Sequence, residues 1–256
     1  MAEREIRLEQ RDGVALVTIS DPARRNAMAL DLSEALVEAI LTAERHEDVG
    51  AVVITGEPPA FCAGADLSQL GASKEDALRA IYRGFLAVAE CALPTVAAVN
   101  GAAVGAGLNL ALACDLRLAG PHARFDPRFL ALGLHPGGGY TWMAHRILGP
   151  QGAAALTLFG EVLGAEEAER VGLVWRAVDD PVAEAVTLAA RAAGAPRELA
   201  IAAKRSMRVT AGQTSQRDAV EVEIRAQLAS LESPAFAERL AALRAKVSRK
   251  QSDTER

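Results

Sequence analysis

The spacing of hydrophobic residues changes repeatedly along the first half of the chain. Strand-length apolar runs occur at 14–20, 51–55 and 95–99, and between them hydrophobic residues such as Leu32, Leu36 and Ile40 recur every three or four positions. Alternation of these two patterns predicts an α/β core with crossover connections. The predicted elements are strands at 5–9, 14–20, 51–55, 95–99 and 115–119 and helices at 30–41, 74–90 and 107–113.

Beyond Pro136 the pattern becomes mainly helical, with one further predicted strand at 174–178. Proline at 196 and at 234 marks two plausible helix starts in the last part of the chain. We therefore expect a core over residues 1–195 and a C-terminal helical arm or lid over residues 196–256. The predicted helices are 140–148, 151–159, 165–171, 181–193 and 197–207.

Composition narrows the class of protein. The 256 residues are 50% hydrophobic and 24% charged, as in an ordinary globular protein, and the net charge of −5 argues against a nucleic-acid surface. The three cysteines have no CxxC spacing and the four histidines form no cluster, so no metal site is expected. The apolar stretch 94–112 is interrupted by asparagines and glycines, and no apolar segment follows the charged N-terminus, which together favour a cytoplasmic protein without a membrane span.

Two glycine-bearing segments carry the clearest chemical signal. Residues 61–67 read FCAGADL and residues 100–107 read NGAAVGAG, and each stands between a strand-like and a helix-like run. The unpaired N–H groups at the two helix starts can then face one ligand. Two N–H groups converging on one oxygen stabilise a developing negative charge, so the pair of segments predicts an oxyanion hole.

These segments, together with DPARRNAM at 21–28 and GLHPGGG at 133–139, closely resemble the enoyl-CoA hydratase/isomerase (crotonase) family in order and spacing. The resemblance spans about residues 5–250. It implies an α/β fold, a crotonase-like spiral of ββα units with a C-terminal helical region. It also implies an acyl-CoA thioester substrate, no cofactor apart from the coenzyme A of that substrate, and a homotrimer or hexamer.

The resemblance also implies roles for individual residues. The thioester carbonyl oxygen is expected between the backbone N–H groups of Ala65 and Ala106. The binding loops around these donors contribute Gly64, Asp66 and Gly105, and the expected coenzyme A contacts are Ala63 and Leu67 with the adenine and Arg25 with a phosphate. Two alternatives stay open, because Arg25 can also be a solvated surface charge and Asp66 can serve as a helix cap or a structural hydrogen-bonding group.

At two positions the chain departs from the family. The two glutamates that hydratases use map onto Asn109 and Phe129, and neither side chain can transfer a proton at neutral pH. The nearby replacement candidates for the acid/base are Asp126, Arg128 and His135, and the two that can act as a base are Asp126 and His135. These two also have structural interpretations, since Asp126 precedes a proline at a possible helix start and His135 can bond loop backbone.

The sequence thus favours an enzyme of the lyase or isomerase type in fatty acid metabolism, which stabilises a thioester enolate in the oxyanion hole without the two hydratase glutamates. The alternative is a non-catalytic acyl-CoA binding protein, which would also keep the hole and lose the glutamates.

Overall fold

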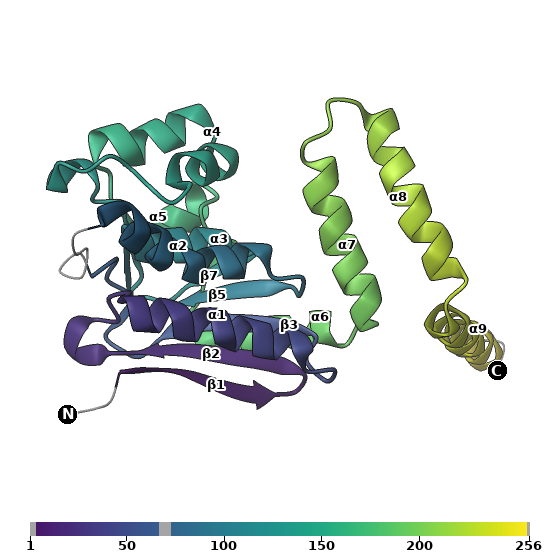
Figure 1. Ribbon diagram of the computed structural model, residues 1–256. Helices are drawn as coiled ribbons and strands as arrows, with labels where there is room; N and C mark the ends of the chain where they lie inside the picture. Colours follow the sequence, from purple (N-terminus) through teal and green to yellow (C-terminus); the bar gives the residue numbers. More distant parts are fainter. Residues whose placement is uncertain (1–3, 67–72, 255–256) are drawn as a thin grey trace. The chain divides into compact units, whose positions relative to one another are not determined.

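The computed structural model describes residues 4–66 and 73–254, with side chains described up to residue 245. The chain divides into two compact units, Met1–Gly194 and Ala195–Arg256 (Figure 1).

The first unit contains a six-stranded sheet in the order β1-β2-β3-β5-β7-β10. Its first two strands form an antiparallel hairpin, and the remaining neighbours pair in parallel. The hairpin turns at Asp12 and Gly13, whose φ values of 49° and 75° are those that a tight two-residue turn requires. The strands are β1 (Glu5–Arg11), β2 (Val14–Ser20), β3 (Ala51–Gly56), β5 (Thr95–Val99), β7 (Leu116–Ala119) and β10 (Arg176–Ala177).

A second sheet has the order β4-β6-β8-β9 and is built from very short strands. Each of β3, β5 and β7 in the first sheet is followed along the chain by a strand of the second sheet, so every repeat supplies one strand to each sheet. This arrangement is the expected spiral of ββα units. The strands are β4 (Ala60–Cys62), β6 (Ala102–Val104), β8 (Arg124–Asp126) and β9 (Leu163–Gly164).

Helix α6 (Pro181–Ala193) packs on the large sheet because its alanines permit a close approach. Ala185 and Ala189 are buried against every second residue of the strands, including Leu16, Val53 and Val96. Helices α1 (Leu30–Arg45) and α2 (Lys74–Glu90) pack against each other in the same unit, as Figure 1 shows. This packing supplies the rigid core that carries the loops described below.

Most predicted elements of the first unit are present, with small shifts. Helix α3 (Ala106–Ala113) begins one residue early, and the two helices predicted around position 150 form α4 (Tyr140–Phe159), which is interrupted where Gly149 has a φ of 68° and a ψ of −179°. Proline at 150 explains this break, since it removes a helical hydrogen bond. Helix α5 (Ala165–Arg170) precedes β10, which is shorter than predicted.

The second unit consists of α7 (Arg197–Thr210), α8 (Gln216–Leu231) and α9 (Pro234–Thr254). Helix α8 has no buried residue, and its exposed hydrophobic residues Val220, Ile224, Leu228 and Leu231 follow helical spacing along one face. An apolar groove of about 630 Å³ lies among the three helices, with Leu199, Ala226 and Phe236 in its lining. Within the described residues, no helix combines the length and apolar character needed to cross a membrane.

Candidate active site

The two glycine-bearing segments lie side by side because β4 and β6 pair in parallel, with Ala60 opposite Ala102. Gly64 has a φ of 106°, and a β-carbon there would lie 2.9 Å from the Val104 carbonyl oxygen and 3.9 Å from the Ala106 nitrogen. A β-carbon on Gly107 would lie 2.7 Å from the Cys62 carbonyl carbon. Glycine is therefore required at both positions for the main chains to approach this closely.

The second segment turns sharply into α3. Gly105 has a φ of 51° and a ψ of −113°, and its N–H donates to the Asp126 carbonyl at 2.9 Å. The Asn109 N–H donates to the Gly105 carbonyl at 3.0 Å as the first helical bond, so the N–H of Ala106 belongs to the first turn, which has no helical acceptors. Ala106 is half-buried at this helix start.

The first segment is held by the 25–28 loop. The Ala63 N–H donates to the Arg25 carbonyl at 3.0 Å and the Asp66 N–H to the Met28 carbonyl at 2.9 Å, while the Met28 N–H donates to Gly64. Met28 and Ala65 form a parallel bridge. The Gly64 carbonyl faces this loop, and the C=O and N–H of one trans peptide unit point in opposite directions, so the Ala65 N–H points away from the loop.

A side chain that the sequence analysis did not single out anchors the 25–28 loop. The Asn26 carboxamide is completely buried and accepts from the Asp21 N–H at 2.9 Å, and it donates to the carbonyls of Glu57 and Ala60 at 2.7 Å each. In the sequence, only the position of Asn26 inside the DPARRNAM motif could have indicated this structural role.

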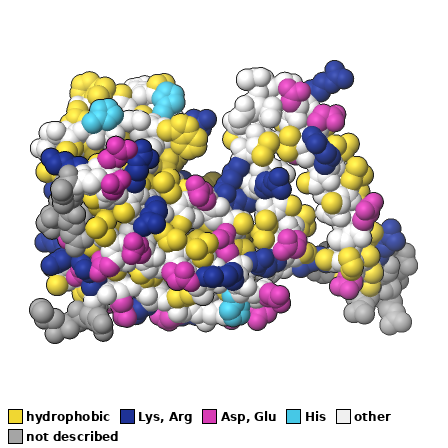
Figure 2. Space-filling model, viewed as in Figure 1, with side chains coloured by type: hydrophobic (Ala, Val, Ile, Leu, Met, Phe, Trp, Pro, Cys, Tyr) yellow, Lys and Arg dark blue, Asp and Glu magenta, His cyan; other side chains and the backbone are white. Residues whose placement is uncertain are grey.

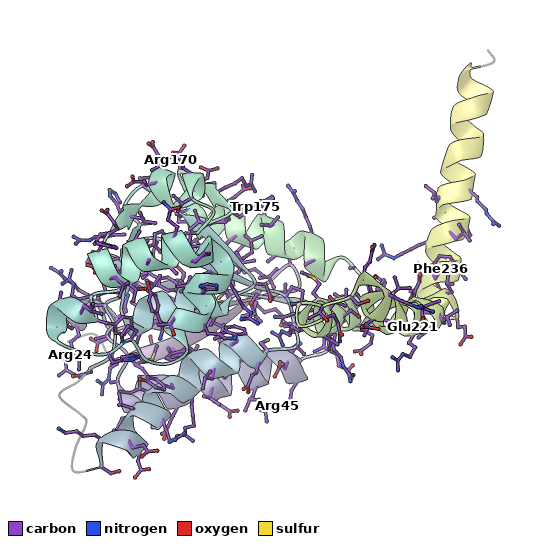
Figure 3. All side chains as sticks on the ribbon, turned by 90° about the horizontal axis from the view of Figure 1, so that it is seen from above. Arg24, Arg45, Arg170, Trp175, Glu221 and Phe236 are labelled. Carbon is purple, nitrogen blue, oxygen red and sulfur yellow. The ribbon has the colours of Figure 1, made fainter. Side chains whose placement is uncertain are left out.

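The expected coenzyme A contacts lie around the same loop. Arg25 is exposed with a φ of 52°, and Ala63 is half-buried. Arg24, labelled in Figure 3, places its Nη1 atom 3.6 Å from Asp66 Oδ2. Asp66 thus takes part in a surface ion pair, and Leu67 lies outside the described residues.

Asn109 contacts the glycine run 137–139. Its Nδ2 donates to the Gly137 carbonyl at 2.9 Å, and its Oδ1 is buried with no hydrogen-bond partner among the described residues. The Gly137 carbonyl fixes this orientation of the amide, because a flipped side chain would place two acceptors against each other. Asn109 therefore connects α3 to the glycine run through a neutral donor.

Phe129 packs against Tyr140, with ring centroids 5.2 Å apart and an interplanar angle of 51°. Phe129 is half-buried, whereas Tyr140 is only 1% exposed. Burial raises the pKa of Tyr140. Phe129, which the sequence analysis expected at the position of the second family glutamate, thus forms an aromatic contact with Tyr140.

The two acid/base candidates have different surroundings. Asp126 is buried, its Oδ2 accepts from Arg124 at 3.2 Å and from Arg128, and its main-chain oxygen receives the Gly105 N–H. The hydrogen bond with Asp126 raises the pKa of Arg128. His135 is exposed, and its Nδ1 lies 2.7 Å from the Pro136 carbonyl oxygen. The structure therefore brings Asp126 next to the α3 loop and leaves the His135 side chain at the surface.

Helix α2 supplies two aromatic residues that the sequence analysis did not connect with the site. The rings of Tyr82 and Phe85 have centroids 5.4 Å apart, and the Tyr82 hydroxyl lies against Gly137. Burial raises the pKa of Tyr82. Only their spacing of three on a helix was visible in the sequence, and that spacing is equally typical of core packing.

The ββα spiral and the paired main-chain loops at the start of α3 define an α/β protein of the crotonase fold. Residues 9–242 match the family model described as enoyl-CoA hydratase/isomerase. The chain therefore belongs to the enoyl-CoA hydratase/isomerase family, a family of enzymes that act on CoA thioesters.

Individual relatives agree with this assignment. The chain is 56% identical over 238 residues to the probable enoyl-CoA hydratase EchA14 of Mycobacterium tuberculosis, covering 90% of this chain and 93% of that protein. It is 33% identical over 255 residues to 4-chlorobenzoyl coenzyme A dehalogenase-2 of an Arthrobacter species, covering 96% and 92%. Its fold matches the crystal structure of enoyl-CoA hydratase from Bacillus anthracis with a TM-score of 0.89 at 27% identity, covering 95% and 97% of the two chains.

Proposed function

We propose that the chain binds an acyl-CoA thioester with its carbonyl oxygen between the N–H groups of Ala65 and Ala106 and stabilises the enolate that forms there. The observation that carries this proposal is the contact of Gly64 with the start of α3, where a β-carbon would lie 3.9 Å from the Ala106 nitrogen. Main-chain donors held in this way need no reorganisation when charge develops on the oxygen.

The reaction we propose is a lyase or isomerase reaction that does not use two glutamates. Asn109 and Phe129 are assigned to the positions of the family glutamates. The Asn109 amide instead donates a hydrogen bond to the Gly137 carbonyl, and the Phe129 ring packs against Tyr140. The Arthrobacter relative is named for dehalogenation, so the names within this family are not limited to hydration. Asp126 and His135 remain the proposed acid/base candidates, and Asp126 is the one next to the α3 loop, where its main-chain oxygen accepts the Gly105 N–H.

Coenzyme A is proposed to lie along the 25–28 loop, with Arg25 on a phosphate and Ala63 and Leu67 near the adenine. The exposed position of Arg25 and the bond from Ala63 to its carbonyl support the first part of this assignment. The proposed setting is the cytoplasm and fatty acid metabolism.

The test is turnover of purified protein on short-chain, long-chain and aryl enoyl-CoA thioesters, followed by loss of thioester ultraviolet absorbance and by product analysis. Ala106→Pro removes one donor at a helix position that tolerates proline, and it is expected to lower kcat about 10²- to 10³-fold. Ala106→Ser retains the N–H and is the matched control. Binding of the thioesters without turnover of any of them would replace the proposal with a non-catalytic binding role.

A further inference from the structure

Two pairs of aromatic rings stand at the two ends of the glycine run 137–139. Tyr82 and Phe85 face Gly137 and Gly138, where a β-carbon on Gly138 would lie 2.5 Å from the Phe85 ring. The second pair consists of Phe129 and Tyr140, and Tyr140 directly follows the glycine run in the sequence. In each pair one ring is buried and the other is half-buried, so a fixed ring supports each ring that is partly open.

The glycine run between the pairs has no side chains and is fixed in place. Gly138 and Gly139 have φ values of 66° and 81°, and Gly137 is held by the Asn109 amide. Asn109 lies one helical turn after Ala106, and residues at that spacing have β-carbons about 5–6 Å apart on one helix face. The rings therefore border the turn that adjoins the proposed thioester carbonyl site.

We infer that this part of the site accepts an aromatic acyl group and that Tyr82 and Phe129 determine this specificity. The inference rests on the proposed function for the position of the thioester. Aromatic rings gain affinity from offset or edge-to-face contacts with a flat ring beyond the area that they bury, by a factor of about 2 to 12 for each pair. A saturated ring of the same size buries a similar area without those contacts.

The experiment uses isothermal titration calorimetry on the full chain to compare two thioesters, phenylacetyl-CoA and cyclohexylacetyl-CoA. They differ only in whether the six-membered ring of the acyl group is aromatic or saturated. Wild-type protein is expected to bind phenylacetyl-CoA about tenfold more tightly. Equal affinities, or tighter binding of cyclohexylacetyl-CoA, would overturn the inference and leave the proposed function intact. Failure of both thioesters and of hexanoyl-CoA to bind would overturn the proposed function and, with it, the inference.

Variants assign the preference to the two rings. Tyr82→Leu and Phe129→Leu are each expected to reduce the preference for phenylacetyl-CoA to below about threefold, while Tyr82→Phe keeps the ring and retains it. Phe159→Leu is the matched control, because Phe159 is 81% exposed at the far end of α4. Loss of the preference in Tyr82→Phe would assign it to the hydroxyl and overturn the ring contact. An unchanged preference for phenylacetyl-CoA in both leucine variants would also overturn the inference. Circular dichroism checks that every variant is folded.

Discussion

At the scale of single residues, Cys62 shows how closely the site is packed. Its thiol is completely buried at the end of β4, and its main chain lies under Gly107 at the start of α3. Burial raises the pKa of the Cys62 thiol from 9.0 to about 11. The folded protein therefore favours the protonated thiol more strongly than the unfolded chain does.

This pKa shift predicts a loss of stability at alkaline pH. The contribution is fully present below the unfolded pKa of 9.0 and is lost as pH rises toward about 11, because the unfolded chain releases the proton first. Between pH 8 and pH 10 the free energy of unfolding of the wild type should fall by about 1.4 kcal/mol more than that of Cys62→Ala. Urea unfolding at the two pH values measures this difference, and parallel losses in both proteins would contradict the assignment.

Asn109→Asp should destabilise the protein in a pH-dependent way. The new carboxylate would face the Gly137 carbonyl in a buried position where Nδ2 now donates, and we expect a loss of about 3 kcal/mol at pH 7.5. Burial raises the pKa of such a carboxyl group, so the deficit should shrink as pH falls toward about 4 and the protonated group can donate again.

Thermal unfolding at pH 4.5 and pH 7.5 measures the deficit of this variant. Asn109→Leu removes the same hydrogen bond without adding a titratable group, and its deficit should be the same at both pH values. A deficit of Asn109→Asp that does not change with pH would show that the side chain leaves the buried position.

Sequence reasoning at this scale led to two proposed main-chain donors and missed the side chains that hold their loops in place. Ala65 and Ala106 could be proposed because glycine patterns locate main-chain N–H groups without any knowledge of side-chain contacts. The roles of Asn26 and Tyr82 depend on partners 31 and 55 positions away along the chain, Glu57 and Gly137. The surroundings of Asp126 and His135 likewise depend on tertiary burial, which a motif does not encode.

At the scale of elements, the packing of α3 on β4 determines the position of the Ala106 N–H group. Gly107→Ala should push the helix away from the strand, since the new β-carbon would lie 2.7 Å from the Cys62 carbonyl carbon and 2.8 Å from its β-carbon. We expect a loss of about 1–3 kcal/mol in the free energy of unfolding together with a fall in turnover.

Gly164→Ala is the matched control for this variant, because no atom lies within 4 Å of a β-carbon at that position and its φ of −79° suits any residue. Chemical unfolding and the thioester assay compare the two proteins. Wild-type stability and activity in Gly107→Ala would mean that the start of α3 does not depend on this contact.

The elements themselves were predictable where their pattern was long. The predicted helix over 74–90 and strand over 95–99 have the bounds of α2 and β5, because their hydrophobic spacing extends over enough residues to distinguish a helix from a strand. The second sheet was not predicted as a sheet. Its strands have two or three residues each, and a run that short does not distinguish the hydrophobic spacing of a helix from that of a strand.

At the scale of the whole molecule, the hydrophobic face of α8 needs a covering surface. Val220, Ile224, Leu228 and Leu231 are between 44% and 55% exposed, and Figure 2 shows hydrophobic side chains along the helices of this unit. Phe236, labelled in Figure 3 at the start of α9, is 40% exposed. We propose that copies of this chain cover these residues in a homotrimer or hexamer.

Sedimentation velocity tests this proposal. Wild-type protein should sediment as a trimer or hexamer, and the double variant Ile224→Glu with Leu228→Glu should dissociate, because two carboxylates would enter an apolar contact. Glu221→Gln, on the same helix and labelled in Figure 3, should leave the assembly unchanged. A monomeric wild type would contradict the proposal.

The approach of Gly64 to the start of α3 also bears on how such a protein can diverge. Contacts made by the main chain persist through nearly every replacement of Ala65 or Ala106, with proline as the exception. The aromatic and amide groups around them change their chemistry with a single nucleotide substitution. Mutational drift can therefore alter which acyl group is accepted and which proton is moved, while the main-chain centre that we propose for the thioester oxygen is inherited unchanged.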